Sequence, residues 1–229
     1  MCVHGRHRRV RVSPLPDFGE WSPAKDEFPR HAASTNTPRF RDEQVKLQFD
    51  TNVFALLRIT RATLPHFRAQ RSGTIMSLSS IGGLHGFPSN GIYCATKAAV
   101  ESLTETLAQE VSSFGINCVI VEPGYFRTAF LAGPASGANV APGMGVYEGT
   151  VAGEARRAFG AYDGSQPGDP DEAAARMWEY VAGEGLFRGK KKLLRLPLGS
   201  DCREMLKAHD EGVNEVLEEY EDVMKSTDF

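Results

Sequence analysis

The sequence predicts an α/β fold, a doubly wound parallel sheet in a single domain, because helix-like and strand-like patterns alternate along most of the chain. Apolar residues recur at helical spacing over residues 42–68 and again over residues 90–114. Short apolar runs over residues 74–79 and 116–121 are typical of buried strands. Successive strands that are joined by a crossover helix run parallel, so this order predicts a parallel sheet covered by helices.

The first of these helices contains Pro65, which predicts a kink or an end of the helix near that residue. Residues 131–170 are rich in Gly, Ala and Pro, and we expect them to form a substrate loop at the carboxyl end of the sheet. The elements expected after the loop are a helix that begins at Asp169, a last strand over residues 191–198 and a C-terminal helix that begins at Asp201.

Residues 1–41 differ from the rest of the chain, because they show no sustained period and are interrupted by prolines. We expect them to form an irregular or disordered N-terminal segment, and residues 42–229 to form the folded domain.

The composition of the 229 residues argues against several classes of protein. A net charge of −3 gives no reason to expect nucleic acid or an anionic membrane as a partner. The four cysteines form no CxxC pair, so neither a metal site nor a disulfide framework is predicted, and a reducing, cytoplasmic location is expected. No apolar run approaches the roughly 18 residues of a membrane span.

Three polar side chains point to a specific chemistry. Tyr93 and Lys97 are four residues apart and share one face of the helix 90–114, and Ser80 follows the strand 74–79. A phenol needs a nearby positive charge to act as an acid or base near neutral pH, and Lys97 supplies one. Ser80 is suited to hydrogen-bond the oxygen of a carbonyl substrate. Since no side chain donates a hydride, such a site needs a cofactor.

Ser80, the motif Tyr93-x-x-x-Lys97 and the turn Pro123–Gly124 occur in the order of the short-chain dehydrogenase/reductase family, which residues 42–229 resemble. The resemblance implies a Rossmann-like fold and NAD(P)H-dependent interconversion of a carbonyl and a secondary alcohol on a small molecule. It makes Tyr93 the general acid/base and Ser80 the group that polarises the carbonyl. Lys97 lowers the pKa of the tyrosine and binds the nicotinamide ribose.

The same resemblance adds residues on both sides of this trio. Asn52 matches a fourth catalytic residue, which holds a water that links the lysine to solvent. The segment Leu196–Asp201 is similar to that of an NADP-using branch, so NADP is expected, with NAD not excluded. The family also pairs the helices 42–68 and 90–114 across a twofold axis, which implies a homo-oligomer. The residues implied at the cofactor are Asn52, Tyr93, Lys97, Pro123, Gly124, Phe126 and Thr128.

The sequence departs from the family at one point. Members open with a strand, a TGxxxGxG turn that holds the pyrophosphate and a helix, whereas the early glycines here are Gly5 and Gly19. The expectation is therefore a truncated Rossmann-like sheet with an unpaired edge at the strand 74–79. The alternative to an active oxidoreductase is a catalytically impaired or inactive fragment, a pseudoenzyme that acts through association with a related chain.

Plain structural roles stay open for some of these residues. Lys97 is also placed to pair with Glu101 one turn further along the helix. Thr128 is also a suitable helix N-cap, and His85 is suited to a solvated loop.

Overall fold

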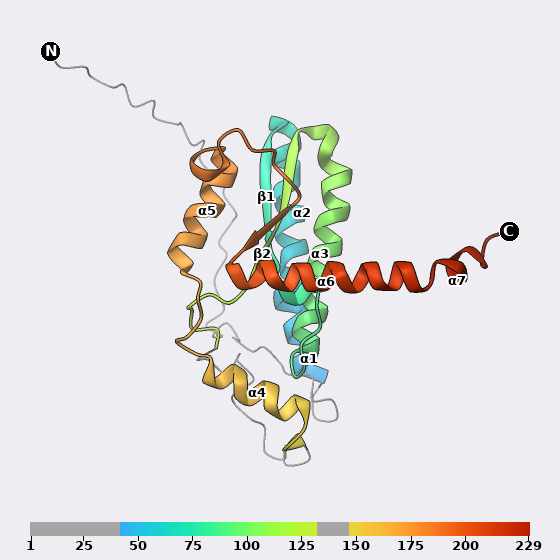
Figure 1. Cartoon of the computed structure of the whole chain (residues 1–229). Helices are drawn as coiled ribbons and strands as arrows, with labels where there is room; N and C mark the ends of the chain where they lie inside the picture. The colour runs from blue at the N-terminus through green and yellow to red at the C-terminus, as the bar shows by residue number, and fades with distance from the viewer. Residues whose placement is uncertain (1–41, 132–146) are drawn as a thin grey trace.

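The structure, a computed structural model, describes residues 42–131 and 147–229, in which helices flank a small parallel sheet (Figure 1). The sheet has three strands in the order β1-β2-β3, and both pairs of neighbours are parallel. The strands are β1 (Gly73–Leu78), β2 (Ile116–Pro123) and β3 (Arg195–Leu198). The α/β prediction is confirmed, but the last strand is shorter than the predicted 191–198, because its pairing with β2 begins at Arg195.

Helices precede, connect and follow these strands, and a kinked helical segment leads into β1. In chain order the helical elements are α1 (Asp42–Phe49), the π-helical η1 (Asp50–Phe54), α2 (Ala55–Gln70), the short η2 (Ile81–Gly83), α3 (Gly91–Val111), the short η3 (Ser112–Phe114), α4 (Val151–Ala161), α5 (Pro170–Ala182), the short η6 (Gly185–Phe187), α6 (Ser200–Glu219) and α7 (Glu221–Lys225).

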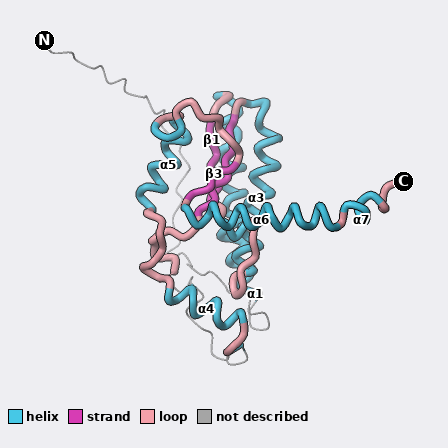
Figure 2. Tube along the Cα trace, in the orientation of Figure 1, coloured by secondary structure: helices cyan, strands magenta, loops and turns pink. Residues whose placement is uncertain are grey.

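Alternate residues of β2 face opposite sides of the sheet, and each side has its own apolar core. Ile116 and Cys118 pack with Leu64 of α2 and with the end of α3 on one side. Val119 and Val121 pack with residues of α5 and β3 on the other side. Helices therefore cover both faces of the sheet, as a doubly wound fold requires (Figure 2).

Two features of the helices differ from the expectations. Helix α2 continues through Pro65 to Gln70, so it does not end at the proline. Pro65 has no N–H, so it cannot bond the carbonyl of Arg61 one turn earlier. Both residues are exposed, so water can bind that carbonyl instead. The irregular turn of this helix lies earlier, in the π-helical η1. The expected substrate loop 131–170 also contains helix α4.

The expected N-terminal segment 1–41 and residues 132–146 of the substrate loop lie outside the described residues. Within the described ranges, no helix combines the length and the apolarity that crossing a membrane demands.

Candidate active site

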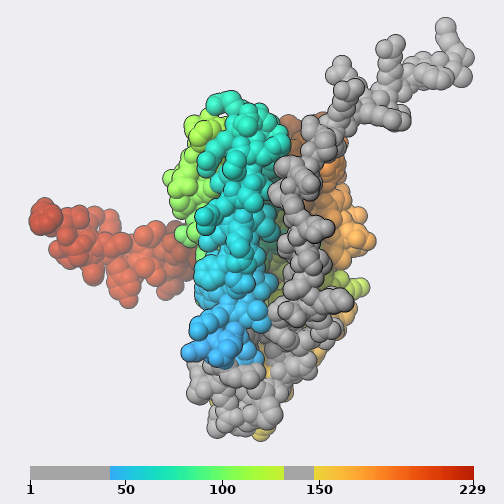
Figure 3. All heavy atoms as spheres, turned by 180° about the vertical axis from the view of Figure 1, so that it is seen from behind, coloured from blue at the N-terminus to red at the C-terminus, as the bar shows by residue number. Residues whose placement is uncertain are grey.

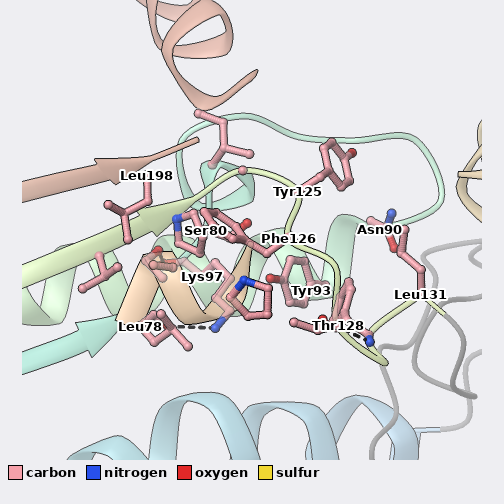
Figure 4. A pocket seen from close by; sticks show the side chains of 18 of the residues that line it. Leu78, Ser80, Asn90, Tyr93, Lys97, Tyr125, Phe126, Thr128, Leu131 and Leu198 are labelled. Carbon is pink, nitrogen blue, oxygen red and sulfur yellow. Dashed lines mark hydrogen bonds between the residues drawn. The ribbon is translucent and has the colours of Figure 1, made fainter. Parts of the chain in front are cut away.

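The predicted site residues gather around one cavity of about 410 Å³ at the carboxyl ends of β1 and β2 (Figure 4). This location follows from the topology, because parallel strands direct the loops that follow them to the same edge of the sheet. The predicted residues that line the cavity are Asn52, Ser80, Tyr93, Lys97, Pro123, Gly124, Phe126 and Thr128.

Ser80 lies at the point where β1 passes into the short helix η2. Its backbone is extended and its Oγ accepts a hydrogen bond from the N–H of Gly82 at 3.1 Å, which fixes the hydroxyl at the start of the loop. A Cβ at Gly82 would lie 3.4 Å from the Tyr93 ring and 3.6 Å from Ser80 Oγ. Gly82 thus packs against both predicted catalytic side chains.

Tyr93 and Lys97 point from one face of α3 into the cavity, with Lys97 Nζ 5.6 Å from the centre of the Tyr93 ring. The ammonium donates a hydrogen bond to the carbonyl of Leu78 at 2.8 Å, drawn as a dashed line in Figure 4. Burial lowers the pKa of Lys97 to about 8, partly opposed by the nearby charge of Glu101. The amine is therefore close to its titration point near neutral pH.

The sequence predicted a lowered pKa for Tyr93, and this prediction is wrong for the isolated chain. Burial of the phenol raises the pKa of Tyr93, and hydrogen bonding to Ser80 opposes this shift only in part. Desolvation of the phenolate outweighs that favourable contact. The protonated phenol, which is the form that donates a proton, is stabilised.

Asn52 lies in the π-helical turn η1, and its Nδ2 donates a hydrogen bond to Thr96 Oγ1 at 3.0 Å. Thr96 is fully buried and its hydroxyl donates in turn to the Tyr93 carbonyl at 2.7 Å. Asn is unfavourable inside an apolar helix, and this bond to α3 accounts for its presence. Single π-helical turns often occur at functional sites.

The loop Pro123–Thr128 begins at the last residue of β2 and is held by the end of β3 and the start of α6. The N–H of Tyr125 donates to Asp201 Oδ2 at 2.7 Å, and the N–H of Gly124 donates to the Leu198 carbonyl at 2.9 Å. A Cβ at Gly124 would collide with the Asp201 carboxylate, so this position requires glycine. Thr128 Oγ1 accepts from the N–H of Phe130 in a local turn, and no helix begins there within the residues that the structure describes.

Asp201 is a site-organising residue that sequence reasoning missed. The sequence marks Asp201 as the start of the C-terminal helix and as the end of the segment Leu196–Asp201, but nothing in it indicates the contact of Asp201 with a loop more than seventy positions earlier. An acidic residue in the first turn of a helix was the available signal, but it has an ordinary explanation in the helix dipole.

A buried charge cluster, also unpredicted, lies behind the site. Arg195 of β3 contacts Glu101 of α3 at 2.5 Å and is also bonded to Glu122 of β2. Glu122 is fully buried, and burial raises the pKa of its carboxyl despite the bond to Arg195. Glu101 therefore pairs with Arg195 rather than forming the predicted helical pair with Lys97, on which it acts only through its charge.

The described walls of the cavity are largely apolar. Lys97 is the only charged side chain among the described lining residues. Besides the predicted residues, the apolar side chains of the lining include Phe87, Phe130, Leu131, Phe159 and Met177. Within the two described ranges no group of His, Cys, Asp and Glu is arranged to hold a metal ion, and Cys94, Cys118 and Cys202 are buried and free.

Known proteins share this sequence pattern and this architecture. The family described as short chain dehydrogenase matches residues 31–137. The crystal structure of a short-chain dehydrogenase from Streptomyces avermitilis is similar with a TM-score of 0.72 and 34% sequence identity, over 87% of this chain and 69% of that chain. The chain belongs to the short-chain dehydrogenase/reductase family.

Two relatives of known name match shorter segments. A 3-ketodihydrosphingosine reductase of Bacteroides thetaiotaomicron is 45% identical over 89 residues, which are 39% of this chain and 33% of that protein. The human 17-beta-hydroxysteroid dehydrogenase type 1 is 38% identical over 90 residues, 39% of this chain and 27% of that protein. The match thus spans about a third or less of the length of each of these two relatives.

Proposed function

We propose that this protein is an NAD(P)H-dependent oxidoreductase that interconverts a carbonyl and a secondary alcohol. The observation that supports this function best is the convergence of Ser80, Tyr93 and Lys97 on one cavity at the carboxyl ends of the strands. An acid, a second hydroxyl and a cation at one apolar cavity are what protonation of a carbonyl oxygen requires.

In the direction of reduction, Ser80 and Tyr93 hydrogen-bond the carbonyl oxygen and Tyr93 transfers its proton to it. Tyr93 starts from the protonated form that its raised pKa favours. Lys97 then stabilises the phenolate that this transfer creates, since it lies 5.6 Å from the ring. In the direction of oxidation the same groups remove the proton from the alcohol.

Four lining residues fit the nicotinamide end of a dinucleotide, which supplies or accepts the hydride when bound. Pro123, Gly124, Phe126 and Thr128 line the same cavity as Tyr93 and Lys97. The sequence offers no TGxxxGxG turn for the pyrophosphate. We infer NADP rather than NAD as the cofactor, because the segment Leu196–Asp201 is similar to that of an NADP-using branch of the family. A fluorescence titration with NADPH and with NADH tests this inference, and equal affinities for the two would contradict it.

The substrate that we infer is uncharged and mostly apolar. Aromatic and aliphatic side chains form most of the described lining of the cavity, and Lys97 is its only described charge. Two relatives carry the names of a ketodihydrosphingosine reductase and a hydroxysteroid dehydrogenase, both of which refer to largely apolar molecules. A cavity of about 410 Å³ lies in the usual range for a site that binds a small molecule.

The test is steady-state oxidation of NADPH with an apolar ketone and with a keto acid of equal size. We expect turnover of the apolar ketone, a weaker reaction with the keto acid, and loss of turnover in Tyr93→Phe by about 10²–10⁴-fold. Tyr147→Phe is the matched control, because Tyr147 is not among the described residues that line the cavity. Wild-type chain that neither binds NADPH nor oxidises it would overturn the proposal.

A second candidate function is association with a related chain. Among the described strands, β1 pairs only with β2, and Leu78 at its end is 58% exposed. An unpaired strand edge is a ready site for pairing with another chain. Phe54 and Ile59, both exposed on η1–α2, are consistent with the homo-oligomer proposed through helices 42–68 and 90–114. Co-purification with a full-length relative, together with no NADPH binding, would favour this candidate.

A further inference from the structure

The C-terminal helix begins inside the body of the protein and then leaves it. The first turns of α6 are fixed, because Cys202 is fully buried and its Sγ donates to the Glu122 carbonyl at 3.1 Å. From Asp210 onward every residue is exposed. In both Figure 1 and Figure 3 the rest of α6 and α7 stands clear of the body, and we call residues 210–225 the arm.

One side of the arm is an apolar stripe. Val213, Val216, Leu217, Tyr220, Val223 and Met224 are each between 44% and 60% exposed. Their spacing is that of a heptad repeat, with Val213 and Tyr220 at one core position and Val216 and Val223 at the other. The backbone of Tyr220 is not helical, so α6 ends before it and α7 begins after it, but two hydrogen bonds span the bend: Tyr220 N–H donates to the Val216 carbonyl and Met224 N–H donates to the Tyr220 carbonyl. An isolated helix with such a stripe exposed to water lacks the packing that stabilises it.

The charges on the arm indicate what covers the stripe. The acidic residues that lie on the side away from the stripe in this repeat are Glu211, Glu215, Glu218, Glu221 and Asp222. An anionic membrane or a nucleic acid would be repelled by a helix of this charge. Two such helices that pack stripe to stripe keep these carboxylates in water on their outer sides.

We propose that the arm pairs with the same arm of a second copy of this chain, stripe against stripe, in a twofold dimer. The contact is isologous, so one set of apolar residues supplies both sides of the seam. The arm stands away from the body of its own chain (Figure 1), so pairing through the arms does not require contact between the two active sites. This interface is distinct from the one proposed through helices 42–68 and 90–114.

The pairing has a consequence for the cavity. The fixed start of α6 supplies Asp201, which holds the N–H of Tyr125 at 2.7 Å, and Gly124 lies against the same carboxylate. A second copy that restrains the arm thereby also restrains the helix that positions the loop Pro123–Thr128.

The experiment measures the mass of the full chain in solution by sedimentation velocity over a range of concentrations. The double variant Val216→Glu/Val223→Glu is expected to raise the dimer Kd by about a hundredfold or more. Both positions are exposed in the single chain, so the folded body is unaffected and circular dichroism serves as the check. Val151→Glu, a residue 70% exposed at the start of α4, is the matched control and leaves the Kd unchanged.

A cross-linking measurement separates arm-to-arm pairing from docking of the arm on another surface. In a Cys2→Ser background, Leu217→Cys near the middle of the stripe is expected to cross-link to its own counterpart with a short bis-maleimide. Glu218→Cys, one residue along but on the outer side, is expected to react without forming dimers. A double variant with unchanged mass, or equal cross-linking of the two cysteines, would overturn the proposal. Neither readout depends on NADPH or on catalysis.

Discussion

Replacement of Arg195 by Met removes the only guanidinium that the described structure places between two buried carboxylates. Glu122 is fully buried and Glu101 is 4% exposed, and both contact Arg195. Glu105 is more distant, at 3.7 Å, and exposed. Removing one partner from a fully buried ion pair costs about 3–5 kcal/mol, because the remaining charge stays buried without compensation. The Arg195 side chain is 35% exposed, so water screens part of this charge and we expect a loss of about 3 kcal/mol. That loss is a large fraction of the ~5–15 kcal/mol by which a domain is stable.

The loss depends on pH in a direction that the structure fixes. The folded-state pKa of Glu122 is already raised above its ordinary value, and removing the cation raises it further. A carboxyl whose pKa is higher in the folded state than in the unfolded state favours folding while it is protonated. This contribution to stability is fully present below the unfolded pKa of about 4.3 and is lost as pH rises through the folded pKa. Arg195→Met is therefore expected to be most destabilised at or above neutral pH and to recover in part near pH 5.

The assay is urea unfolding followed by far-UV circular dichroism at both pH values. Arg203→Met is the control, because Arg203 pairs with Glu204 on the surface and such pairs are worth at most about 1 kcal/mol. The triple variant Arg195→Met/Glu101→Gln/Glu122→Gln removes the buried charges and is expected to regain most of the lost stability. Equal stability of Arg195→Met and wild type at neutral pH, or the same loss at both pH values, would refute the reasoning.

Three further predictions follow from the site. The Nζ of Lys97, followed by NMR of labelled lysines and assigned with Lys97→Arg, is expected to titrate near pH 8, and a midpoint above 10 would contradict this. Because its pKa is lowered on folding, its contribution to stability is present above the unfolded pKa of about 10.4 and falls as pH drops through 8. The ammonium on which the proposed mechanism relies is lost as pH rises past 8. Gly124→Ala is expected to destabilise the fold and weaken NADPH binding, since the added Cβ collides with Asp201. Gly86→Ala, with open space around the added Cβ, is expected to change neither stability nor binding. Equal behaviour of the two variants would rule out a steric requirement for glycine at position 124. Asn52→Ala is expected to lower the free energy of unfolding in urea by about 1 kcal/mol, because the hydrogen bond to Thr96 is lost. In a Thr96→Val background the same substitution is expected to have no such effect. An equal loss of stability in both backgrounds would show that this hydrogen bond is not the cause.

Local patterns in the sequence predicted the elements and the spacing of the site well. The two strands β1 and β2, the helix α3 and the shared face of Tyr93 and Lys97 all follow from short-range periodicity and backbone preference. The eight predicted site residues line one cavity because parallel topology brings strand ends together.

The remaining features depend on contacts between distant segments, which periodicity does not encode. Asp201 reaches Tyr125, and Arg195 joins Glu101 to Glu122, across large separations in the chain. The direction of the Tyr93 pKa shift depends on burial by surrounding elements, so the sequence-based prediction considered the cation and missed the desolvation. The π-helical turn at Asn52 was visible in the sequence only as a polar residue in an apolar helix.

The central claim is that Ser80 and Tyr93 act as one unit in delivering a proton to a carbonyl oxygen. Its most direct test is a double-mutant cycle on single-turnover oxidation of bound NADPH by an apolar ketone, using Ser80→Ala, Tyr93→Phe and the double variant. Each single variant is predicted to slow the step by about 10²–10⁴-fold, and the double variant by little more than the slower of the two. Single-variant losses that multiply in the double variant, or a Tyr93→Phe chain as fast as wild type, would contradict the claim.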